Sequence, residues 1–308
     1  MGSIVDVILH LGAHRTGTTS LQAWLLQNED ALARAGTAVW GPDRTRSGLF
    51  AGLLKRPDLV GPEDEAFART GAARIRHEID RLAEQGVERL VISEENTLGS
   101  MLYCLDQETL YPDARARFDR LAWAFGPHLT GLALSIRRYD LWWASVLAVG
   151  RARGLAQPGP RGLDRLVQHP RGWTEVAAAA QAAFGTRPIR VWSFEAFAGN
   201  HPAQLRAMVP GMELPSGLYE PGRIRNASQP CQGARPDGSE PGEEGRYMPF
   251  SPSQRATMLA RYHDDIARLR NATPGLNYVE NAETSGAHPG AAAEEEGLFH
   301  DEQKRGMG

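Results

Sequence analysis

Cysteine and lysine are both scarce in this chain of 308 residues. The two cysteines, Cys104 and Cys231, are too few for a disulfide framework and favour a reducing compartment. Lys55 and Lys304 are the two lysines among 34 basic residues, so arginine or histidine must supply any cationic group in a functional site.

Long apolar runs and a strong net charge are also missing. No stretch of 18 apolar residues occurs, which excludes a membrane-spanning helix. The first residues, MGSIVDVILHLG, lack the basic and long apolar segments of a signal peptide, so we expect a cytoplasmic protein. A formal net charge of −3 argues against nucleic-acid binding through bulk electrostatics.

Short apolar runs alternate with segments of helical periodicity. This alternation predicts βαβ units, and therefore a single α/β domain with a P-loop-type central parallel sheet flanked by helices. The expected strands are 4–11, 37–40, 89–93, 130–136 and 189–194. The expected helices are 18–35, 63–85, 113–125, 139–153, 172–184 and 253–270.

Two late segments break this alternation. Residues 226–252 are dense in proline, glycine and charge, so we expect a mobile loop or lid. Residues 281–308 contain a run of glutamates and are expected to form a flexible acidic tail. The sequence thus predicts one domain over residues 1–280, followed by this tail.

The most informative stretch is LHLGAHRTGTTSLQ, residues 9–22. An expected strand leads into a loop bounded by Gly12 and Gly17, and an expected helix begins at Thr18. This order points backbone N–H groups and the positive end of the helix dipole at one place, which favours an anion. Arg15 adds a cation, and Thr18 and Thr19 add hydroxyl donors.

The glycine spacing is that of the G-x-x-x-x-G-K-[ST] nucleotide-binding loop, but Thr18 stands in the lysine position. A kinase or NTPase acting on Mg-ATP remains an alternative, with Glu94 as a strand-end carboxylate. A non-catalytic nucleotide-binding module is a second alternative.

HLGAHRTGTTSLQ resembles the phosphosulfate loop of sulfotransferases that use 3′-phosphoadenosine 5′-phosphosulfate (PAPS). It is most similar to a bacterial branch whose loop reads H-x-G-x-H-[KR]-T-G-T-T-S-x-Q. The resemblance implies PAPS as co-substrate, with Arg15 at the phosphate–sulfate bridge and Thr18 and Thr19 on the 5′-phosphate. The loop residues expected to contact the donor are Gly12, Ala13, His14, Arg15, Thr16, Gly17, Thr18, Thr19 and Ser20.

The same resemblance implies a second anion site for the 3′-phosphate. In that family an arginine at a strand end works with a serine eight residues later, and Arg137 and Ser145 have this spacing. Arg138 is a neighbouring candidate, and Arg223 is a candidate in a late basic loop. Ser20 stands where many members carry an adenine-stacking aromatic residue, so the adenine partner is unassigned.

Sulfuryl transfer also needs a proton acceptor near the acceptor substrate. The strand expected at 89–93 ends beside Glu94 and Glu95, on the sheet edge where the phosphate loop should lie. Glu95 is the first candidate for the base and Glu94 the second. His14 is an alternative within the loop, while His10 is expected to be a core histidine.

No metal is expected, because the sequence has neither H-E-x-x-H nor a cysteine cluster.

The function that the resemblance implies is sulfuryl transfer from PAPS to a hydroxyl or amine acceptor. The acceptor, a small molecule, glycan, lipid or peptide, would be received by segments 41–75, 150–172 and 226–252. Their arginines favour an anionic acceptor or form a solvated face: Arg44, Arg46, Arg151, Arg153 and Arg161.

Overall fold

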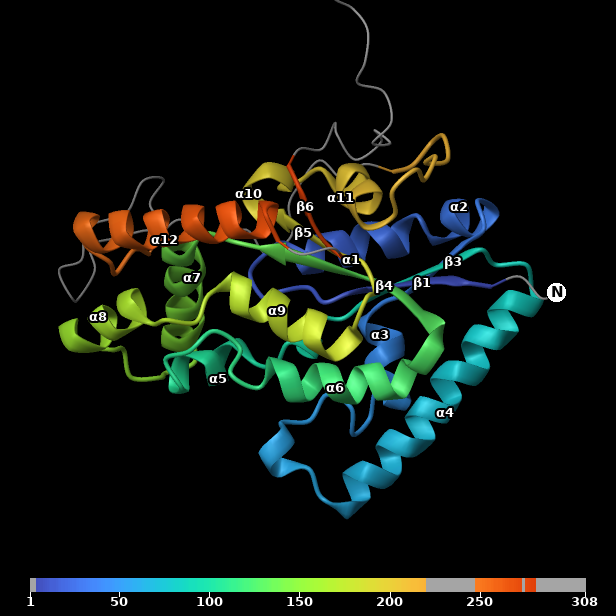
Figure 1. Ribbon diagram of the computed structural model, residues 1–308, viewed down its shortest axis with the longest axis horizontal. Helices are drawn as coiled ribbons and strands as arrows, with labels where there is room; N and C mark the ends of the chain where they lie inside the picture. Colours follow the sequence, from blue (N-terminus) through green and yellow to red (C-terminus); the bar gives the residue numbers. More distant parts are fainter. Residues whose placement is uncertain (1–3, 220–246, 273–274, 281–308) are drawn as a thin grey trace, which may run out of the picture.

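The computed structural model describes residues 4–219, 247–272 and 275–280, and its centre is a parallel β-sheet. Six strands lie in the order β2-β3-β1-β4-β5-β6, and every neighbouring pair is parallel (Figure 1). Their bounds are β1 Asp6–His10, β2 Thr37–Trp40, β3 Arg89–Ser93, β4 Leu129–Ile136, β5 Ile189–Ser193 and β6 Leu276–Val279. The predicted fold class is confirmed.

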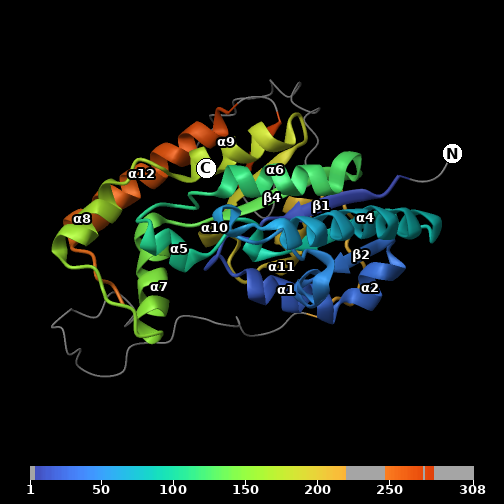
Figure 2. The ribbon, with the colours of Figure 1, turned by 90° about the horizontal axis from the view of Figure 1, so that it is seen from below.

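Helices cover both faces of the sheet (Figures 1 and 2). One face is covered by α1 (Thr18–Gln27), α2 (Glu29–Arg34) and α11 (His201–Met208). The other packs against α4 (Pro62–Glu84), α6 (Ala114–Phe125), α7 (Tyr139–Ala152), α9 (Trp173–Phe184) and α12 (Pro252–Arg270). Shorter elements are α3 (Pro42–Arg44), η1 (Thr45–Leu49), η2 (Pro57–Leu59), η3 (Glu95–Thr97), α5 (Met101–Asp106), η4 (Gly126–His128), α8 (Pro160–Gln168) and α10 (Phe194–Phe197).

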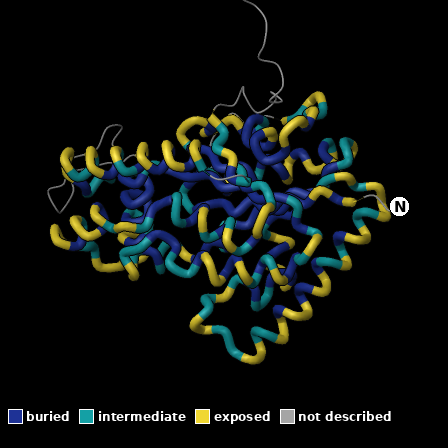
Figure 3. The backbone as a smooth tube through the Cα atoms, viewed as in Figure 1, coloured by how far each residue is buried: buried dark blue, intermediate teal, exposed yellow. Residues whose placement is uncertain are grey.

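The strands are apolar on both sides, as a sheet covered on both faces requires. In β1, Val7 and Leu9 belong to the cluster that includes α6 and α9, whereas Ile8 belongs to the cluster under α1. Figure 3 shows that the centre of the molecule is mostly buried and that the outer faces of the helices are exposed. Within the described ranges, no helix combines the length and apolar character needed to cross a membrane.

The five predicted strands are present, and β6 is a sixth that the sequence analysis did not predict. The helix predicted over 18–35 is divided into α1 and α2 at Asn28. The Asn28 side-chain amide donates to the carbonyls of Trp24 and Tyr219, at 2.9 and 3.2 Å, and competes with a continuous backbone ladder.

The sequence analysis did not predict three further helices, although a capping residue or a first-turn proline marks the start of each. These helices are α5, α8 and α11. Ser100 caps α5, Asn200 caps α11, and Pro160 occupies the first turn of α8. Each helix has nine residues or fewer, so its hydrophobic periodicity is weak evidence by itself.

Two predicted segments fall largely outside the described residues. These are residues 226–246 of the expected loop or lid, and the expected tail at 281–308. The described end of the first segment packs on the protein: Phe250 is buried, and Tyr247 and Met248 contact the larger apolar cluster.

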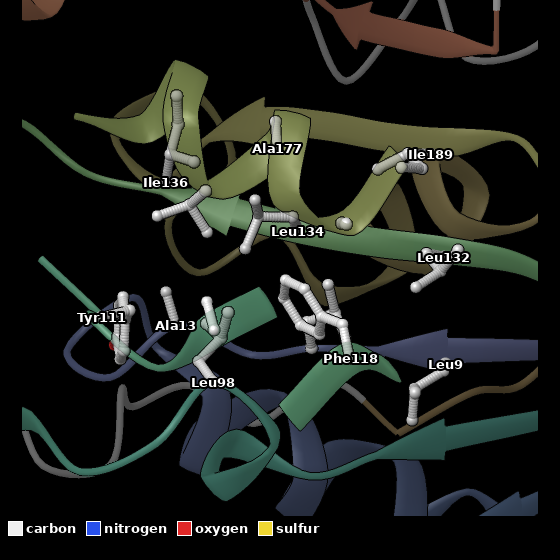
Figure 4. Packing of buried hydrophobic residues seen from close by; sticks show 14 of the residues in the cluster. Leu9, Ala13, Leu98, Tyr111, Phe118, Leu132, Leu134, Ile136, Ala177 and Ile189 are labelled. Atoms are coloured by element: carbon white, nitrogen blue, oxygen red, sulfur yellow. The ribbon is translucent and has the colours of Figure 1, made fainter. Parts of the chain in front are cut away.

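Phe118 gives a direct test of this core. Its side chain is fully buried in the cluster that contains Leu9 and Leu134 (Figure 4), and its ring centroid lies 5.7 Å from that of Phe184. We expect Phe118→Ala to lower the free energy of unfolding by about 3–5 kcal/mol, because it removes apolar contacts and leaves a cavity.

Trp123→Ala on the same helix is the matched control, since Trp123 is 49% exposed. Urea denaturation of both variants would measure the difference. Equal losses of stability would contradict the placement of α6 against the sheet.

Candidate anion-binding site

The loop between β1 and α1 is closed around a single carbonyl group. The hydroxyl of Thr16 donates to the Ala13 carbonyl at 2.6 Å, and that of Thr18 donates to the same oxygen at 3.3 Å. Both threonines are buried, whereas Thr19 is exposed. The loop thus uses two predicted donor-binding hydroxyls to hold its own shape and leaves Thr19 open to a ligand.

Three residues of the loop adopt left-handed backbone conformations: φ is 53° at Gly12, 66° at Arg15 and 76° at Gly17. A Cβ atom on Gly12 would lie 2.8 Å from Thr18 Cγ2, and one on Gly17 would lie 2.9 Å from Phe194 Cε2. Glycine is therefore required at both positions for space as well as for φ. Arg15 adopts this conformation with a side chain, at a cost of roughly 1–3 kcal/mol.

The start of α1 closes this loop. The first amide groups of a helix have no carbonyl partner within it, and they carry the positive end of the helix dipole. Gly17 precedes α1, whose first residues are Thr18, Thr19 and Ser20. The arrangement is suited to an anionic oxygen cluster.

Two aromatic residues fix the other side of the loop. The His14 backbone N–H donates to the Tyr111 hydroxyl at 2.9 Å, and Trp142 Nε1 donates to the His14 carbonyl at 2.8 Å. Tyr111 is fully buried, and burial raises the pKa of its hydroxyl well above the ordinary value. Both contacts anchor the segment that carries Arg15.

The structure brings Arg15, Arg137 and Ser145 together, although they come from separate parts of the sequence. Arg137 follows β4, and its Nη1 donates to the Arg15 carbonyl at 2.6 Å. Ser145 lies in α7, and its hydroxyl accepts a hydrogen bond from Arg15 Nε at 2.6 Å. The loop and the predicted second anion site are therefore in direct contact.

Neighbouring side chains hold Arg137 and desolvate Arg15. The Arg137 guanidinium lies over the Phe194 ring, 5.0 Å from its centroid, and its Nε is 3.9 Å from a carboxylate oxygen of Glu195. Burial lowers the pKa of Arg15 below its ordinary value, and Glu95 opposes that shift. Since that ordinary value is far above 7, Arg15 remains a cation.

Arg138 makes different contacts. Its guanidinium forms two hydrogen bonds to the buried carboxylate of Asp140, at 2.9 and 3.2 Å. These bonds close the first turn of α7. The backbone N–H of Arg138 donates to Glu195, so the described hydrogen bonds of Arg138 lie away from the loop. Arg223 lies outside the described residues.

Glu94 and Glu95 are adjacent in sequence but differ sharply in environment. Glu94 is fully buried and accepts hydrogen bonds from the Thr45 hydroxyl, the Arg46 guanidinium and the Asn96 backbone N–H. Glu95 is partly exposed, and its carboxylate is 3.3 Å from Arg46 Nη2. A Cβ atom on Gly12 would lie 3.4 Å from the Glu95 Cα atom, so Glu95 borders the loop between β1 and α1.

Arg46 was missed as a candidate site residue. The sequence analysis placed it among arginines that either bind an anionic acceptor or are solvated, yet it bridges Glu94 and Glu95. No local motif marks it, because its partners Glu94 and Glu95 lie 48 and 49 positions later in the sequence. Hydrogen bonds from Arg46 to Glu94 raise the pKa of Arg46.

His10 and His14 are neutral at pH 7. Burial lowers the pKa of His10 to about 4, and burial is also the main reason why the pKa of His14 falls to about 4. His10 Nδ1 is 2.9 Å from the Ser93 hydroxyl, and its ring stacks on Trp192. His14 Nδ1 is 3.2 Å from the Tyr111 hydroxyl. Arg15 and Arg137 therefore supply the positive charge beside the loop.

Metal ligands do not gather here. In the part of the chain that the structure describes, no group of three or more His, Cys, Asp or Glu side chains is placed to hold a metal ion.

Comparison with known proteins gives one structural similarity. No protein-family model matches the sequence, and no curated protein is similar to it. Among solved structures, a sulfotransferase from Alicyclobacillus acidocaldarius is 17% identical in sequence, with a TM-score of 0.44. The match covers 86% of this chain and 94% of that one.

The depressed pKa of His10 predicts a pH dependence of stability. The folded state has the lower pKa, so the unfolded state binds more protons between pH 6.5 and about 4, and stability falls as the pH falls. Between pH 6.5 and 5 we expect His10 to contribute a loss of about 1.5 kcal/mol. His10→Asn should remove this part of the loss in urea titrations at the two pH values.

His263 is exposed, so His263→Asn is the matched control. Between pH 6.5 and 5, this variant should lose as much stability as the wild type. An equal loss in His10→Asn would show that His10 does not titrate as a buried neutral histidine.

Proposed function

We propose that the protein is a PAPS-dependent sulfotransferase that transfers a sulfuryl group to a hydroxyl or amine acceptor. The observation that carries this proposal is the meeting of the β1–α1 loop with Arg137 and Ser145. PAPS has a phosphosulfate at the 5′ position and a phosphate at the 3′ position. A protein selective for it needs two cationic sites close together, and the proximity of Arg15 and Arg137 supports this assignment.

In this proposal the loop binds the phosphosulfate. The first amides of α1, the exposed Thr19 hydroxyl and the Arg15 guanidinium face the anion, while Arg137 and Ser145 hold the 3′-phosphate. Arg15 Nε now donates to Ser145, so donor binding exchanges that neutral partner for an anionic one. Charge-assisted hydrogen bonds are roughly twice as strong as neutral ones, which favours the exchange.

The transfer step needs a base and a stabilised leaving group. The acceptor oxygen or nitrogen forms a bond to sulfur as the bond between sulfur and the bridging oxygen breaks. The bridging oxygen keeps the electron pair as 3′-phosphoadenosine 5′-phosphate (PAP) leaves, and Arg15 stabilises its charge without giving up a proton. Glu95 takes the proton from the acceptor.

Glu95 suits the role of base better than Glu94. The Glu94 carboxylate already accepts bonds from Thr45, Arg46 and Asn96 in a fully buried position. Glu95 is partly exposed beside the loop and has Arg46 as its charged partner. His14 is a weaker candidate, since its Nδ1 is already close to the Tyr111 hydroxyl.

The contacts of Glu94 also weigh against a kinase or NTPase. That function would need a strand-end carboxylate open to Mg²⁺ and a lysine on the phosphates. Glu94 is enclosed by Arg46 and Thr45, and Thr18 stands in the lysine position with its hydroxyl turned to the Ala13 carbonyl.

Binding of PAP and adenosine 5′-phosphate tests the donor assignment. We expect PAP to raise the melting temperature without magnesium, and to bind at least tenfold more tightly than adenosine 5′-phosphate. Arg137→Ala should remove most of that preference, because a hydrogen bond to a charged group contributes about 1.5–3 kcal/mol. Calorimetric titration of both nucleotides would measure it.

Arg81→Ala, at an exposed position of α4, should keep the preference. Equal affinities of the wild type for the two nucleotides would overturn the donor assignment. ATP binding that requires magnesium would favour the NTPase alternative.

Paired glutamate variants test the base. Once an acceptor has been found by a screen for sulfate transfer, Glu95→Gln should lower kcat by about 10²–10⁴-fold with little change in melting temperature. Glu94→Gln should instead lower the melting temperature, because it removes a buried charge from the Arg46 and Thr45 cluster.

A Glu95→Gln enzyme with wild-type kcat would exclude Glu95 as the base. PAP binding without transfer to any screened acceptor would support the non-catalytic alternative.

A further inference from the structure

The helix α12 packs against α7 and α9 (Figure 1). It brings the carboxylate of Asp265 into the protein interior, where this residue is 6% exposed. A buried charge is costly unless hydrogen bonds replace its lost hydration. The candidate anion-binding site does not include this side chain, so its own contacts must explain why it lies there.

One carboxylate oxygen of Asp265 accepts three hydrogen bonds. The donors are the Tyr139 hydroxyl, the Trp173 backbone N–H at 2.8 Å and the Thr174 backbone N–H at 3.4 Å. Trp173 and Thr174 begin α9, and the first amides of a helix have no partner within it. Asp265 therefore caps α9 from α12, and through Tyr139 it also fixes the start of α7.

Gly172 makes this contact possible. A Cβ atom at this position would collide with the Asp265 carboxylate and with the Tyr139 hydroxyl, so a larger residue would push one of them away. The rings of Tyr139 and Trp173 stack, with their centroids 6.2 Å apart. The ends of α7 and α9 and the side chain from α12 thus meet in one closely packed arrangement.

Trp173 connects this arrangement to Arg137. Its side-chain Nε1 donates to the Arg137 carbonyl at 2.7 Å, and the whole side chain is buried. The Arg137 side chain in turn donates to the carbonyl of Arg15 in the anion-binding loop. A shift of Trp173 would therefore move the backbone from which the Arg137 guanidinium extends.

A second residue of α12 contacts the same segment. The Tyr262 hydroxyl donates to Glu195 at 3.4 Å. The other carboxylate oxygen of Glu195 accepts from the Arg138 backbone N–H at 3.2 Å and lies 3.9 Å from Arg137 Nε. Since Tyr262 and Asp265 are three residues apart, they lie on one face of α12. This face holds residues 137–139 at two points.

We propose that Asp265 is a positioning residue for Arg137, acting through Trp173. The inference rests on the proposed function, because the group that Arg137 would recognise is the 3′-phosphate of the donor. A carboxylate that only capped α9 would affect stability. A carboxylate that also positions Arg137 affects recognition of the 3′-phosphate, while the loop keeps its own bonds for the 5′-phosphate.

The test measures the affinities of PAP and adenosine 5′-phosphate for the full chain by calorimetric titration. We expect Asp265→Ala to lower the preference for PAP roughly fivefold, about the contribution of one neutral hydrogen bond, with little change for adenosine 5′-phosphate. Asp265→Asn should keep the preference, because its carbonyl oxygen can accept the same bonds.

Two further variants separate positioning from stability. Trp173→Phe keeps the backbone contacts of Asp265 and removes the Nε1–H group that donates to Arg137, so it should lower the preference as Asp265→Ala does. It also provides the test if Asp265→Ala does not fold. Leu269→Ala, at a buried position of the same helix, should lower the melting temperature and keep the preference.

A wild-type preference in both Asp265→Ala and Trp173→Phe would overturn the positioning role and leave the donor assignment standing. An equal loss in Leu269→Ala would also overturn it, since the preference would then follow stability alone. If the wild type bound the two nucleotides equally, the donor assignment would fail, and this inference would fail with it.

Discussion

The hydrogen bond from Arg137 to the carbonyl of Arg15 is the contact on which the candidate site depends. It joins the end of β4 to the loop after β1, two neighbouring strands of a parallel sheet. Parallel strands bring their carboxyl ends to one edge, so two cationic segments separated by 122 positions meet there. Without this contact, Arg137 would not be tied to the loop that is proposed to bind the phosphosulfate.

Buried strands of a parallel sheet are apolar, and this explains which elements of the fold could be predicted from the sequence. The apolar runs 37–40 and 89–93 carry enough hydrophobic pattern to give the bounds of β2 and β3 directly. Strand β6 is as short as β2, but Asn277 interrupts its apolar residues and most of the strand is only partly buried, so no continuous apolar run marks it. The split at Asn28 depends on Tyr219, which is 191 positions away, and no local pattern reports such a contact.

In the candidate site, too, some residues could be predicted from local sequence, and others depend on contacts with distant residues. Gly12, Gly17 and Arg15 could be named as candidates from the sequence because a strand, a glycine turn and a helix follow one another there. The difference between Glu94 and Glu95 could not be predicted, since it arises from Arg46 and Thr45 in η1, nearly fifty positions earlier. Spacing likewise could not separate Arg137 from Arg138, whereas their partners do: Arg137 bonds to the loop, and Arg138 bonds to Asp140.

Both groups proposed to act on substrates already have partners within the protein. Arg15 donates to Ser145, and Glu95 is paired with Arg46. Each contact keeps a charged side chain from being buried without compensation, which would cost several kcal/mol per ion. Under the proposed function, the donor's anionic groups would replace the first contact with a stronger one. Arg46 would still hold the Glu95 carboxylate beside the loop.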